Sequence, residues 1–172
     1  MKIIVISDTH GNTRALRDLL ALHPRYDALI FLGDGLRDVC GEDTRGLVAV
    51  RGNCDFFSPD RELFAPSEQT VTFDGVRMLL MHGHEAGVKS GIERACARAV
   101  AADADVLLFG HTHTPLQKYF PEGSEFGSTV SGKGLYAFNP GSLGRPADGR
   151  ASFGVIQIKG GQVLLSHGYL GK

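Results

Sequence analysis

Histidine, aspartate and asparagine recur in five short blocks, and each block directly follows an apolar run. Carboxylate, amide and imidazole groups are common ligands of transition-metal ions, and a set without thiolate suits Mn, Fe or Zn better than Cu(I) or Ca. In an open α/β sheet the ligand crevice lies at the strand ends, where these blocks are expected to fall. The sequence therefore predicts one polynuclear metal site. Its candidate ligands are Asp8, His10, Asp34, Asn53, His82, His111 and His113.

The number of candidate ligands fits two metal ions. Two divalent ions roughly 3.5–4 Å apart need about this many ligands when one carboxylate bridges them. Asp34 is the expected bridge, because it stands alone between Gly33 and Gly35 after a central strand. Residues two positions apart, such as Asp8 and His10, point to the same side of an extended segment, so such a pair can face one crevice.

The apolar runs of the first third predict the elements that position these blocks. Continuous apolar runs are typical of strands buried on both faces. Asn12 or Thr13 can cap a helix that ends at about His23, and residues 35–46 predict a short helix or a loop. This alternating order favours parallel pairing of the strands. The predicted strands are residues 2–7, 28–32 and 47–50.

The rest of the chain predicts mainly antiparallel strands. Asp74-Gly75 supplies a type I′ turn between strands at 70–73 and 76–81. A second helix is expected over 90–102, and the Gly- and Ser-rich residues 121–133 predict a mobile loop. Two sheets packed face to face, with helices outside, would account for this order in a single domain that covers the whole chain. The further predicted strands are residues 106–109, 116–120, 135–138, 153–158 and 163–167.

Composition argues against several classes of protein. The 172 residues carry a formal net charge of −1 and no long basic run, so a stable nucleic-acid complex or an anionic membrane partner is not expected. The apolar runs are shorter than a bilayer requires. Because the first run leads directly into ligand-type residues, we expect no removable signal peptide and predict a cytoplasmic protein. The three cysteines lack C-x-x-C spacing, so neither a disulfide framework nor a thiolate zinc site is expected.

The order and spacing of the blocks resemble those of the calcineurin-like metallophosphoesterases, and specifically of the small bacterial and archaeal phosphodiesterases of the YfcE type. The resemblance implies an α/β fold, a four-layer α/β/β/α sandwich of two mixed β-sheets flanked by helices. It also implies hydrolysis of phosphoester bonds at a dinuclear metal centre. The matching motifs are Ser-Asp-Thr-His-Gly-Asn (7–12), Gly-Asp-Gly (33–35), Gly-Asn-Cys-Asp (52–55), His-Gly-His (82–84), Gly-His-Thr-His (110–113) and Asn-Pro-Gly-Ser (139–142).

The same resemblance divides the ligands between two metal ions. Mn²⁺ is the expected ion, with Fe, Zn and Ni as alternatives. The two ions would neutralise phosphate charge and lower the pKa of a shared water, so that a hydroxide is present for in-line attack on phosphorus. One ion would be held by Asp8, His10, Asp34 and His113, and the other by Asp34, Asn53, His82 and His111.

Three further residues in or after the motifs are candidates for contact with substrate. Asn12 and the backbone amides near Gly11 are expected to contact a phosphate oxygen. Arg145 would either add positive charge there or be an ordinary surface arginine, and we favour the surface arginine. His84 would either support a ligand, contact the substrate or simply occupy a turn.

Cys54 occupies the position where many members of the wider superfamily carry a histidine, the proposed proton donor to the leaving group. Its thiol is either a neutral proton donor or a small, partly buried filler, and we favour the filler. Asp55 is then expected to be a hydrogen-bond partner for the site. Outside the motifs, surface or strand-end positions are expected for His23 and His167, and packing positions for Cys40 and Cys96.

These observations together predict a metal-dependent phosphodiesterase that acts on a small phosphodiester. A metal-dependent phosphomonoesterase is the nearer alternative, but a monoester carries one more negative charge and the motifs contain no Arg or Lys cluster to receive it. The other alternative is a non-catalytic protein-binding scaffold, as in the retromer subunit that resembles these phosphodiesterases. Such scaffolds typically lose ligands, whereas all seven are present here. The sequence leaves open whether the chain forms a homo-oligomer.

Overall fold

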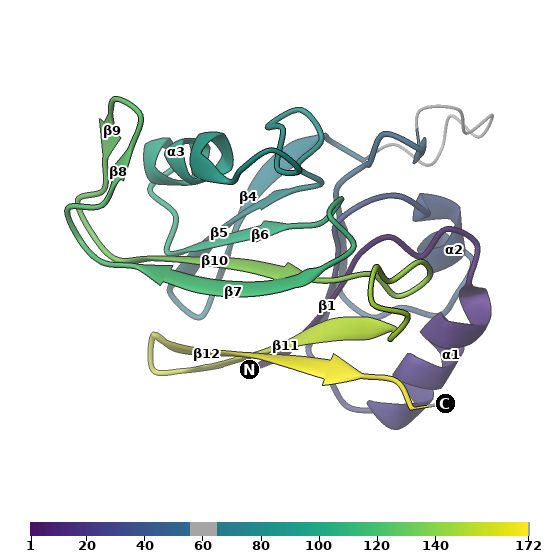
Figure 1. The fold of residues 1–172 in the computed structure, drawn as a ribbon. Helices are drawn as coiled ribbons and strands as arrows, with labels where there is room; N and C mark the ends of the chain where they lie inside the picture. The colour runs from purple at the N-terminus through teal and green to yellow at the C-terminus, as the bar shows by residue number, and fades with distance from the viewer. Residues whose placement is uncertain (56–64, 172) are drawn as a thin grey trace.

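Two five-stranded sheets pack face to face in the computed structural model, which describes residues 1–55 and 65–171 (Figure 1). The first sheet has the strand order β12-β11-β1-β2-β3, and the second has the order β4-β5-β6-β10-β7. Both sheets combine parallel with antiparallel pairs. The α/β class with two mixed sheets is therefore confirmed.

The N-terminal apolar runs form three parallel strands of the first sheet, as predicted. They are β1 (Lys2–Ile6), β2 (Ala28–Phe31) and β3 (Leu47–Ala49). On the other side of β1, the chain returns as the antiparallel strands β11 (Ser152–Lys159) and β12 (Gln162–Tyr169). This return places β11 beside β1, the first strand of the chain.

Two helices connect the first three strands. Helix α1 (Thr13–Leu22) follows Asn12, whose side chain accepts a hydrogen bond from the Ala15 amide at 3.1 Å and so caps the helix. Helix α2 (Leu36–Cys40) lies in the segment where a short helix or loop was expected. Its Cys40 is exposed, so the prediction of a packing role for this residue is wrong.

The second sheet has three central parallel strands and two antiparallel edge strands. The parallel strands are β5 (Val76–Met81), β6 (Val106–Phe109) and β10 (Leu135–Pro140), and the edges are β4 (Glu68–Phe73) and β7 (Pro115–Phe120). Helix α3 (Glu93–Ala101) starts three residues later than the sequence predicts. Across the part of the chain that is described, every helix is too short or too polar to cross a bilayer.

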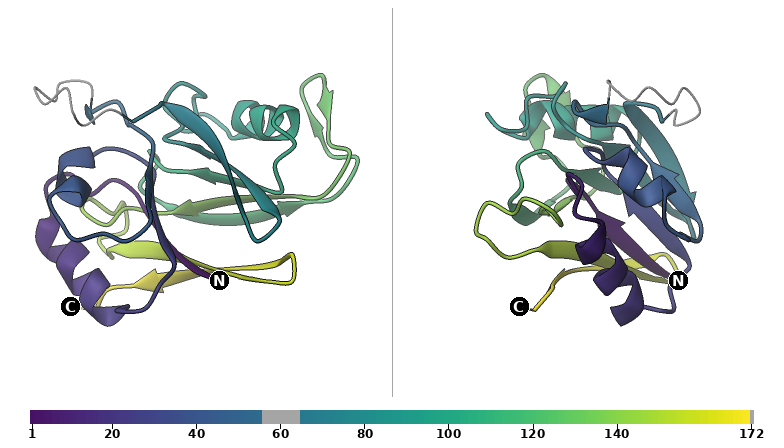
Figure 2. Two further views of the ribbon diagram at one scale, coloured as in Figure 1. Left: turned by 180° about the vertical axis from the view of Figure 1, so that it is seen from behind. Right: turned by 90° about the vertical axis from the view of Figure 1, so that its right-hand side faces the viewer.

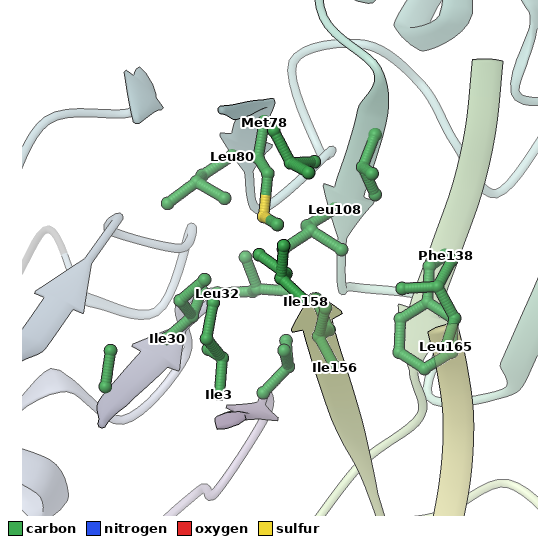
Figure 3. Close-up of a cluster of buried hydrophobic side chains, with 14 of the residues drawn as sticks. Ile3, Ile30, Leu32, Met78, Leu80, Leu108, Phe138, Ile156, Ile158 and Leu165 are labelled. Carbon is green, nitrogen blue, oxygen red and sulfur yellow. The ribbon is translucent and has the colours of Figure 1, made fainter. Parts of the chain in front are cut away.

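The facing sides of the two sheets bury the central core (Figure 3). On the outer face of the first sheet, α1 and α2 pack on residues such as Ile4 and Phe31. On the outer face of the second sheet, α3 packs on Leu79 and Phe109, with its own Cys96 fully buried as predicted. The four α/β/β/α layers implied by the family resemblance are therefore present (Figure 2). The central core includes Ile3, Ile30, Met78, Leu108, Phe138 and Ile156.

Residues 121–133, predicted as a mobile loop, contain a short hairpin. Strand β8 (Glu125–Phe126) pairs with β9 (Thr129–Val130). Phe126 is only 5% exposed, and its ring packs edge-on against that of Phe120, with the centroids 4.9 Å apart. One buried aromatic therefore anchors a segment whose Gly and Ser content suggested mobility.

The two histidines outside the motifs are not at strand ends. His167 lies within β12, where its ring stacks on Phe138 with the centroids 4.4 Å apart. His23 is half-buried at the C-terminal end of α1, and its ring meets Phe153 edge-on at 5.2 Å. Both rings thus contribute to packing, because each has an aromatic neighbour that the sequence order did not reveal.

Candidate metal centre

The candidate ligands lie in loops that follow parallel strands of both sheets. Asp8 follows β1 and Asp34 follows β2 in the first sheet, while His82 follows β5 and His111 follows β6 in the second. The backbone amide of His111 donates to Asp8 Oδ2 at 3.1 Å, which joins the loops of the two sheets. Because these strands end at one edge of the sandwich, the ligands from both sheets meet there.

Asp8, His10 and His113 form one group of potential ligands, with all ligand atoms within 4.8 Å of one another. Asp8 Oδ1 lies 3.1 Å from His113 Nε2 and 3.7 Å from His10 Nε2. The two Nε2 atoms are 3.3 Å apart. Three donor atoms thus converge on a small space, in the mixed oxygen and nitrogen composition that Mn, Fe and Zn accept.

Asp34, His82 and His111 form a second such group, again within 4.8 Å. Asp34 Oδ2 is 3.4 Å from His82 Nε2, which in turn is 3.1 Å from His111 Nδ1. The same Oδ2 atom lies 3.9 Å from His10 Nε2 of the first group. Asp34 therefore faces both groups, the position that a bridging carboxylate requires.

Buried polar atoms test whether these residues fit a cation. Asp8 Oδ2 accepts hydrogen bonds from Ser7 Oγ and the His111 amide, but buried Oδ1 accepts none from the described residues. His82 Nδ1 donates to the Leu32 carbonyl at 2.7 Å, so the neutral ring turns the Nε2 lone pair toward the carboxylates. A buried carboxylate oxygen facing nitrogen lone pairs needs positive charge between them. The residues therefore fit divalent cations.

The pKa values of the metal-free chain show how strongly the carboxylates and imidazoles interact. Burial would raise the pKa of Asp8, but the imidazoles of His10 and His113 beside its carboxylate hold that pKa well below its ordinary value. Burial likewise opposes ionisation of Asp34, yet His82 lowers its pKa. The adjacent Asp8 carboxylate raises the pKa of His113 despite burial. Without a metal, protons thus supply the positive charge that the carboxylates require.

The pKa values of His82 and His111, the two histidines grouped with Asp34, are shifted in opposite directions. Burial lowers the pKa of His82, but hydrogen bonding and charge from Asp34 and Asp8 outweigh burial and raise it. Burial and the nearby charge of His82 lower the pKa of His111 to about 4. Only one proton is therefore readily held between these two rings, because a second positive charge would lie beside the first.

Backbone strain is concentrated at the candidate ligands. Left-handed backbone conformations are uncommon outside glycine and cost of order 1–3 kcal/mol where the structure enforces them. Among the described non-glycine residues, seven have positive φ, and five of these are candidate ligands. The fold thus accepts strain where side chains must converge. The five are Asp8 (55°), His10 (44°), Asp34 (63°), His111 (67°) and His113 (58°).

Asp55 ties two of the ligand loops together. Its carboxylate accepts hydrogen bonds from the amides of Asp34 (2.8 Å), Gly35 (2.9 Å), Leu36 (2.9 Å) and Gly52 (2.7 Å). A carboxylate that accepts several backbone amides fixes their orientation, because each bond is charge-assisted. The interpretation of Asp55 as a hydrogen-bond partner for the site is confirmed.

Cys54 is exposed, so the prediction of a partly buried filler is wrong in that respect. Its amide donates to Asp34 Oδ1 at 2.8 Å, and its Sγ lies within 4.8 Å of ligand atoms of His10 and Asp34. Desolvation by the surrounding loops and the neighbouring Asp34 carboxylate raise the pKa of the thiol to about 11. Asn53 is exposed and donates from Nδ2 to Cys54 Sγ at 3.4 Å, which places its amide beside the thiol.

His84 lies next to the second group but outside it. Its ring centroid is 5.4 Å from that of His82 and 6.0 Å from that of His111. Burial, followed by the charge of His82, lowers the pKa of His84, so the ring is neutral near pH 7. Its position supports the interpretation of a neighbour to ligands or substrate over that of a plain turn residue.

The Gly11 amide, which the sequence assigned to a phosphate contact, has a partner within the protein. Asn12 Oδ1 is taken up by the cap of α1, and the Gly11 amide donates to Asp38 Oδ2 at 2.8 Å. The same carboxylate oxygen accepts from Thr9 Oγ1 at 2.6 Å. Asp38 on α2 thus satisfies the Gly11 amide, whereas the cap of α1 uses Asn12 Oδ1 and not Nδ2, the atom that would donate to a phosphate oxygen. Nothing in the spacing of the motifs pointed to Asp38, because it lies in the connection between strands.

A cavity of about 400 Å³ opens beside the two groups. Its lining includes His10 and Asp34 together with Arg37 and Arg145. Arg145 is exposed, so it is both a surface arginine and a wall of this cavity. Arg37 was missed from the sequence, since it stands outside every motif. A larger cavity of about 660 Å³, lined by Asn12 and residues near the C-terminus, contains none of the seven candidate ligands.

Comparison with known proteins identifies the family. The model of the calcineurin-like phosphoesterase superfamily domain matches residues 1–161. The probable metallophosphoesterase YsnB of Bacillus subtilis is 29% identical over 161 residues, which are 92% of this chain and 85% of YsnB. The phosphodiesterase YfcE of Escherichia coli is 29% identical over 179 aligned positions, covering 91% of this chain and 87% of YfcE.

A solved structure of Vps29 from Entamoeba histolytica, complexed with Zn²⁺, is also similar. It superposes with a TM-score of 0.68 at 21% identity and covers 98% of this chain and 99% of that chain. At this identity the likeness concerns the fold alone. The family model, in contrast, spans all five blocks of candidate ligands. The chain therefore belongs to the calcineurin-like phosphoesterase superfamily and is a metallophosphoesterase.

Proposed function

We propose that this chain hydrolyses small phosphodiesters with two divalent metal ions held side by side. The observation that carries the proposal is that the two groups of potential ligands are adjacent and that the Asp34 carboxylate lies between them. The Asp34 Oδ2 atom lies 3.9 Å from His10 of one group and 3.4 Å from His82 of the other. One ion would be held by Asp8, His10, Asp34 and His113, and the other by Asp34, Asn53, His82 and His111.

The chain's own residues would fix the geometry of the reaction. Two bound cations would neutralise phosphate charge and activate a water. The His82 ring is oriented by the Leu32 carbonyl and the Asp34 loop by Asp55, so little reorganisation remains for the reaction itself. The adjoining cavity would receive the ester, and Arg145 at its wall would contact a phosphate oxygen.

Mn²⁺ is the proposed activating ion, because oxygen and imidazole ligands without a bound thiolate suit it. Fe, Zn and Ni are the alternatives. The exposed Cys54 thiol beside His10 and Asp34 would favour a softer ion such as Zn²⁺ if it were to ligate as a thiolate.

One observation favours the alternative of a phosphomonoesterase. The cavity wall contains Arg37 and Arg145, whose charges a dianionic monoester can use. The sequence motifs alone lacked such charge. The diester assignment therefore rests on the likeness to YfcE, a phosphodiesterase by name, and requires a direct comparison of substrates.

A metal titration combined with a substrate panel tests the proposal. Chelator-treated protein should bind two Mn²⁺ ions per chain in calorimetry. It should then cleave bis(p-nitrophenyl) phosphate in proportion to the second ion bound. Binding of only one Mn²⁺ ion per chain would exclude the dinuclear site. Metal binding without hydrolysis of any diester or monoester in the panel would favour the non-catalytic scaffold instead.

A further inference from the structure

Asn139 is a fully buried polar residue that the proposed reaction does not use. It lies on β10, which pairs in parallel with β6, the strand that leads into the loop of His111 and His113. Asn139 is therefore at the base of that loop, in the same sheet. Burial of an amide side chain is costly unless its polar groups form hydrogen bonds. The partners of these bonds therefore indicate which part of the structure Asn139 supports.

Every polar group of the Asn139 side chain is engaged. Its Nδ2 donates to the Gly110 carbonyl at 2.9 Å and to Thr112 Oγ1 at 3.1 Å, while its Oδ1 accepts from the Gly141 amide at 2.8 Å. The two donors of one amide thus contact both residues that alternate with the histidines of the loop. An ionised aspartate of the same size has no donor, and a protonated one has a single donor, so neither replaces both bonds of the amide.

The backbone of Asn139 is also held from the opposite sheet. His167 Nε2 lies 2.7 Å from the Asn139 carbonyl, and since a carbonyl oxygen only accepts, the ring donates. The same ring stacks on Phe138. The backbone of Asn139 is therefore held independently of the loop. A side chain on a fixed backbone can hold the loop that it contacts in one position.

The loop requires such support because its backbone is strained. His111 and His113 have φ values of 67° and 58°. Gly110 approaches Ser7 and Asp8 so closely that an added Cβ would collide with the Ser7 side chain and lie 3.0 Å from Asp8 Oδ2. Left-handed conformations at two non-glycine residues oppose folding, and a few buried hydrogen bonds can offset that cost.

We propose that Asn139 is a positioning residue for both metal ions. His111 belongs to one ligand group and His113 to the other, so one buried amide sets the positions of a ligand in each. The inference rests on the proposal that these two histidines bind metal. Loss of the Asn139 donors should loosen both rings and weaken metal binding, without removal of any ligand.

The test is calorimetric titration of Mn²⁺ into chelator-treated wild type, Asn139→Asp and Ser131→Ala. Ser131 is a matched control, since it is 3% exposed and its Oγ donates to the Lys133 carbonyl far along the chain from any ligand. We expect Asn139→Asp to bind Mn²⁺ about 10–100-fold more weakly. Its kcat should return toward the wild-type value at saturating Mn²⁺. Ser131→Ala should lower the unfolding temperature but leave the affinity unchanged.

Wild-type affinity in Asn139→Asp would overturn the inference, as would an equal loss in Ser131→Ala. If Asn139→Asp fails to fold, Thr112→Val removes one acceptor from the half-buried loop and should still weaken Mn²⁺ binding severalfold. Unchanged affinity in that variant would then refute the positioning role. No Mn²⁺ binding by the wild type itself would overturn the proposed function, and this inference with it.

Discussion

The Nε2 atom of His113 lies 3.1 Å from Asp8 Oδ1, while Nδ1 of the same ring contacts the Arg145 carbonyl at 2.6 Å. A carbonyl oxygen only accepts, so Nδ1 carries the proton and the neutral ring directs the Nε2 lone pair at the carboxylate. Two electron-rich atoms at this distance repel each other. A proton or a metal ion must therefore lie between them, and the two compete for one place.

Mn²⁺ binding should therefore release protons and become stronger as the pH rises above about 6.5. The pKa values of His82 and His113 are raised above the ordinary 6.5, so protonated rings must lose a proton before they can bind metal. Titration calorimetry in two buffers of different ionisation enthalpy would measure the protons released per Mn²⁺. Equal apparent enthalpies in both buffers would contradict the prediction.

The metal-free chain should show the opposite pH dependence of stability. A histidine whose pKa is raised on folding stabilises the fold fully below its unfolded pKa of about 6.5, and the contribution is lost as the pH rises through the folded pKa. The unfolding temperature in excess chelator should therefore fall above pH 6.5. The pKa of His111 is instead lowered on folding, to about 4, so this residue destabilises the fold as the pH falls below about 6.5 and does not change the trend above that pH.

Asp34→Asn should weaken both metal sites together. The amide keeps the shape of the side chain but removes the charge that faces His10 and His82. Mutation of a residue that only hydrogen-bonds to a metal ligand typically lowers metal affinity about 10–100-fold. Loss of the charge of a bridging ligand should therefore lower the affinity for each ion at least about 100-fold. Titration of Mn²⁺ into the chelator-treated variant measures both affinities, and excess EDTA should abolish activity of the wild type.

Asp74→Asn is the matched control for that substitution. Asp74 also has positive φ, at 48°, but it lies exposed in the hairpin turn between β4 and β5. Asn is well tolerated in such a turn, so the variant should keep its stability, metal affinity and activity. Full turnover by Asp34→Asn, or loss of activity in both variants alike, would count against the dinuclear site.

The sequence predicts the parts of this molecule that depend on local pattern. The parallel strands follow from continuous apolar runs, and the hairpin at 74–75 follows from Asp-Gly, whose two residues both have positive φ. The loops that contain candidate ligands follow from polar residues placed directly after such runs. Spacing alone therefore indicates which residues can meet at one edge of the sandwich.

What the sequence does not reveal depends on contacts between distant segments. Asp38 contacts the segment after β1 from a helix that the motifs do not include. Phe126 turns a Gly-rich segment into a packed hairpin, and His167 reaches Asn139 from the far end of the chain. Each contact joins elements whose order gives no periodic signal, because tertiary packing decides it.

The Cys54 thiol should contribute little to the cleavage of activated esters. Its pKa is raised to about 11, so it remains a neutral, weak acid throughout the neutral range. Nitrophenolate leaves without protonation, so Cys54→Ala should change turnover of bis(p-nitrophenyl) phosphate less than about threefold. If that variant instead lost activity a hundredfold, with both Mn²⁺ ions still bound in calorimetry, the thiol would be catalytic.

Cys54→His should improve poor leaving groups selectively. An alkoxide needs a proton as it departs, and general acid catalysis is typically worth about 10²–10⁴-fold. The exposed position beside Asn53 leaves space for a ring. Methyl p-nitrophenyl phosphate and a dialkyl phosphate, assayed at equal Mn²⁺, should separate the effects. Equal gains for both would show that the ring acts on the metal or on folding, not on the leaving group.

The activated diester should be cleaved with a higher kcat/KM than the matching monoester, although Arg37 and Arg145 line the cavity. The carboxylates of Asp38 and Asp55 line the same cavity and offset part of the arginine charge, and the diester preference rests on the likeness to YfcE, a phosphodiesterase by name. Arg145→Gln should then lower kcat/KM for the monoester about 10–100-fold, the value of one charge-assisted hydrogen bond, and for the diester less. Arg150→Gln, exposed over Tyr169 at the other cavity, is the control and should alter neither. A monoester preference in the wild type that Arg145→Gln reverses would instead identify a phosphomonoesterase whose specificity depends on this one arginine.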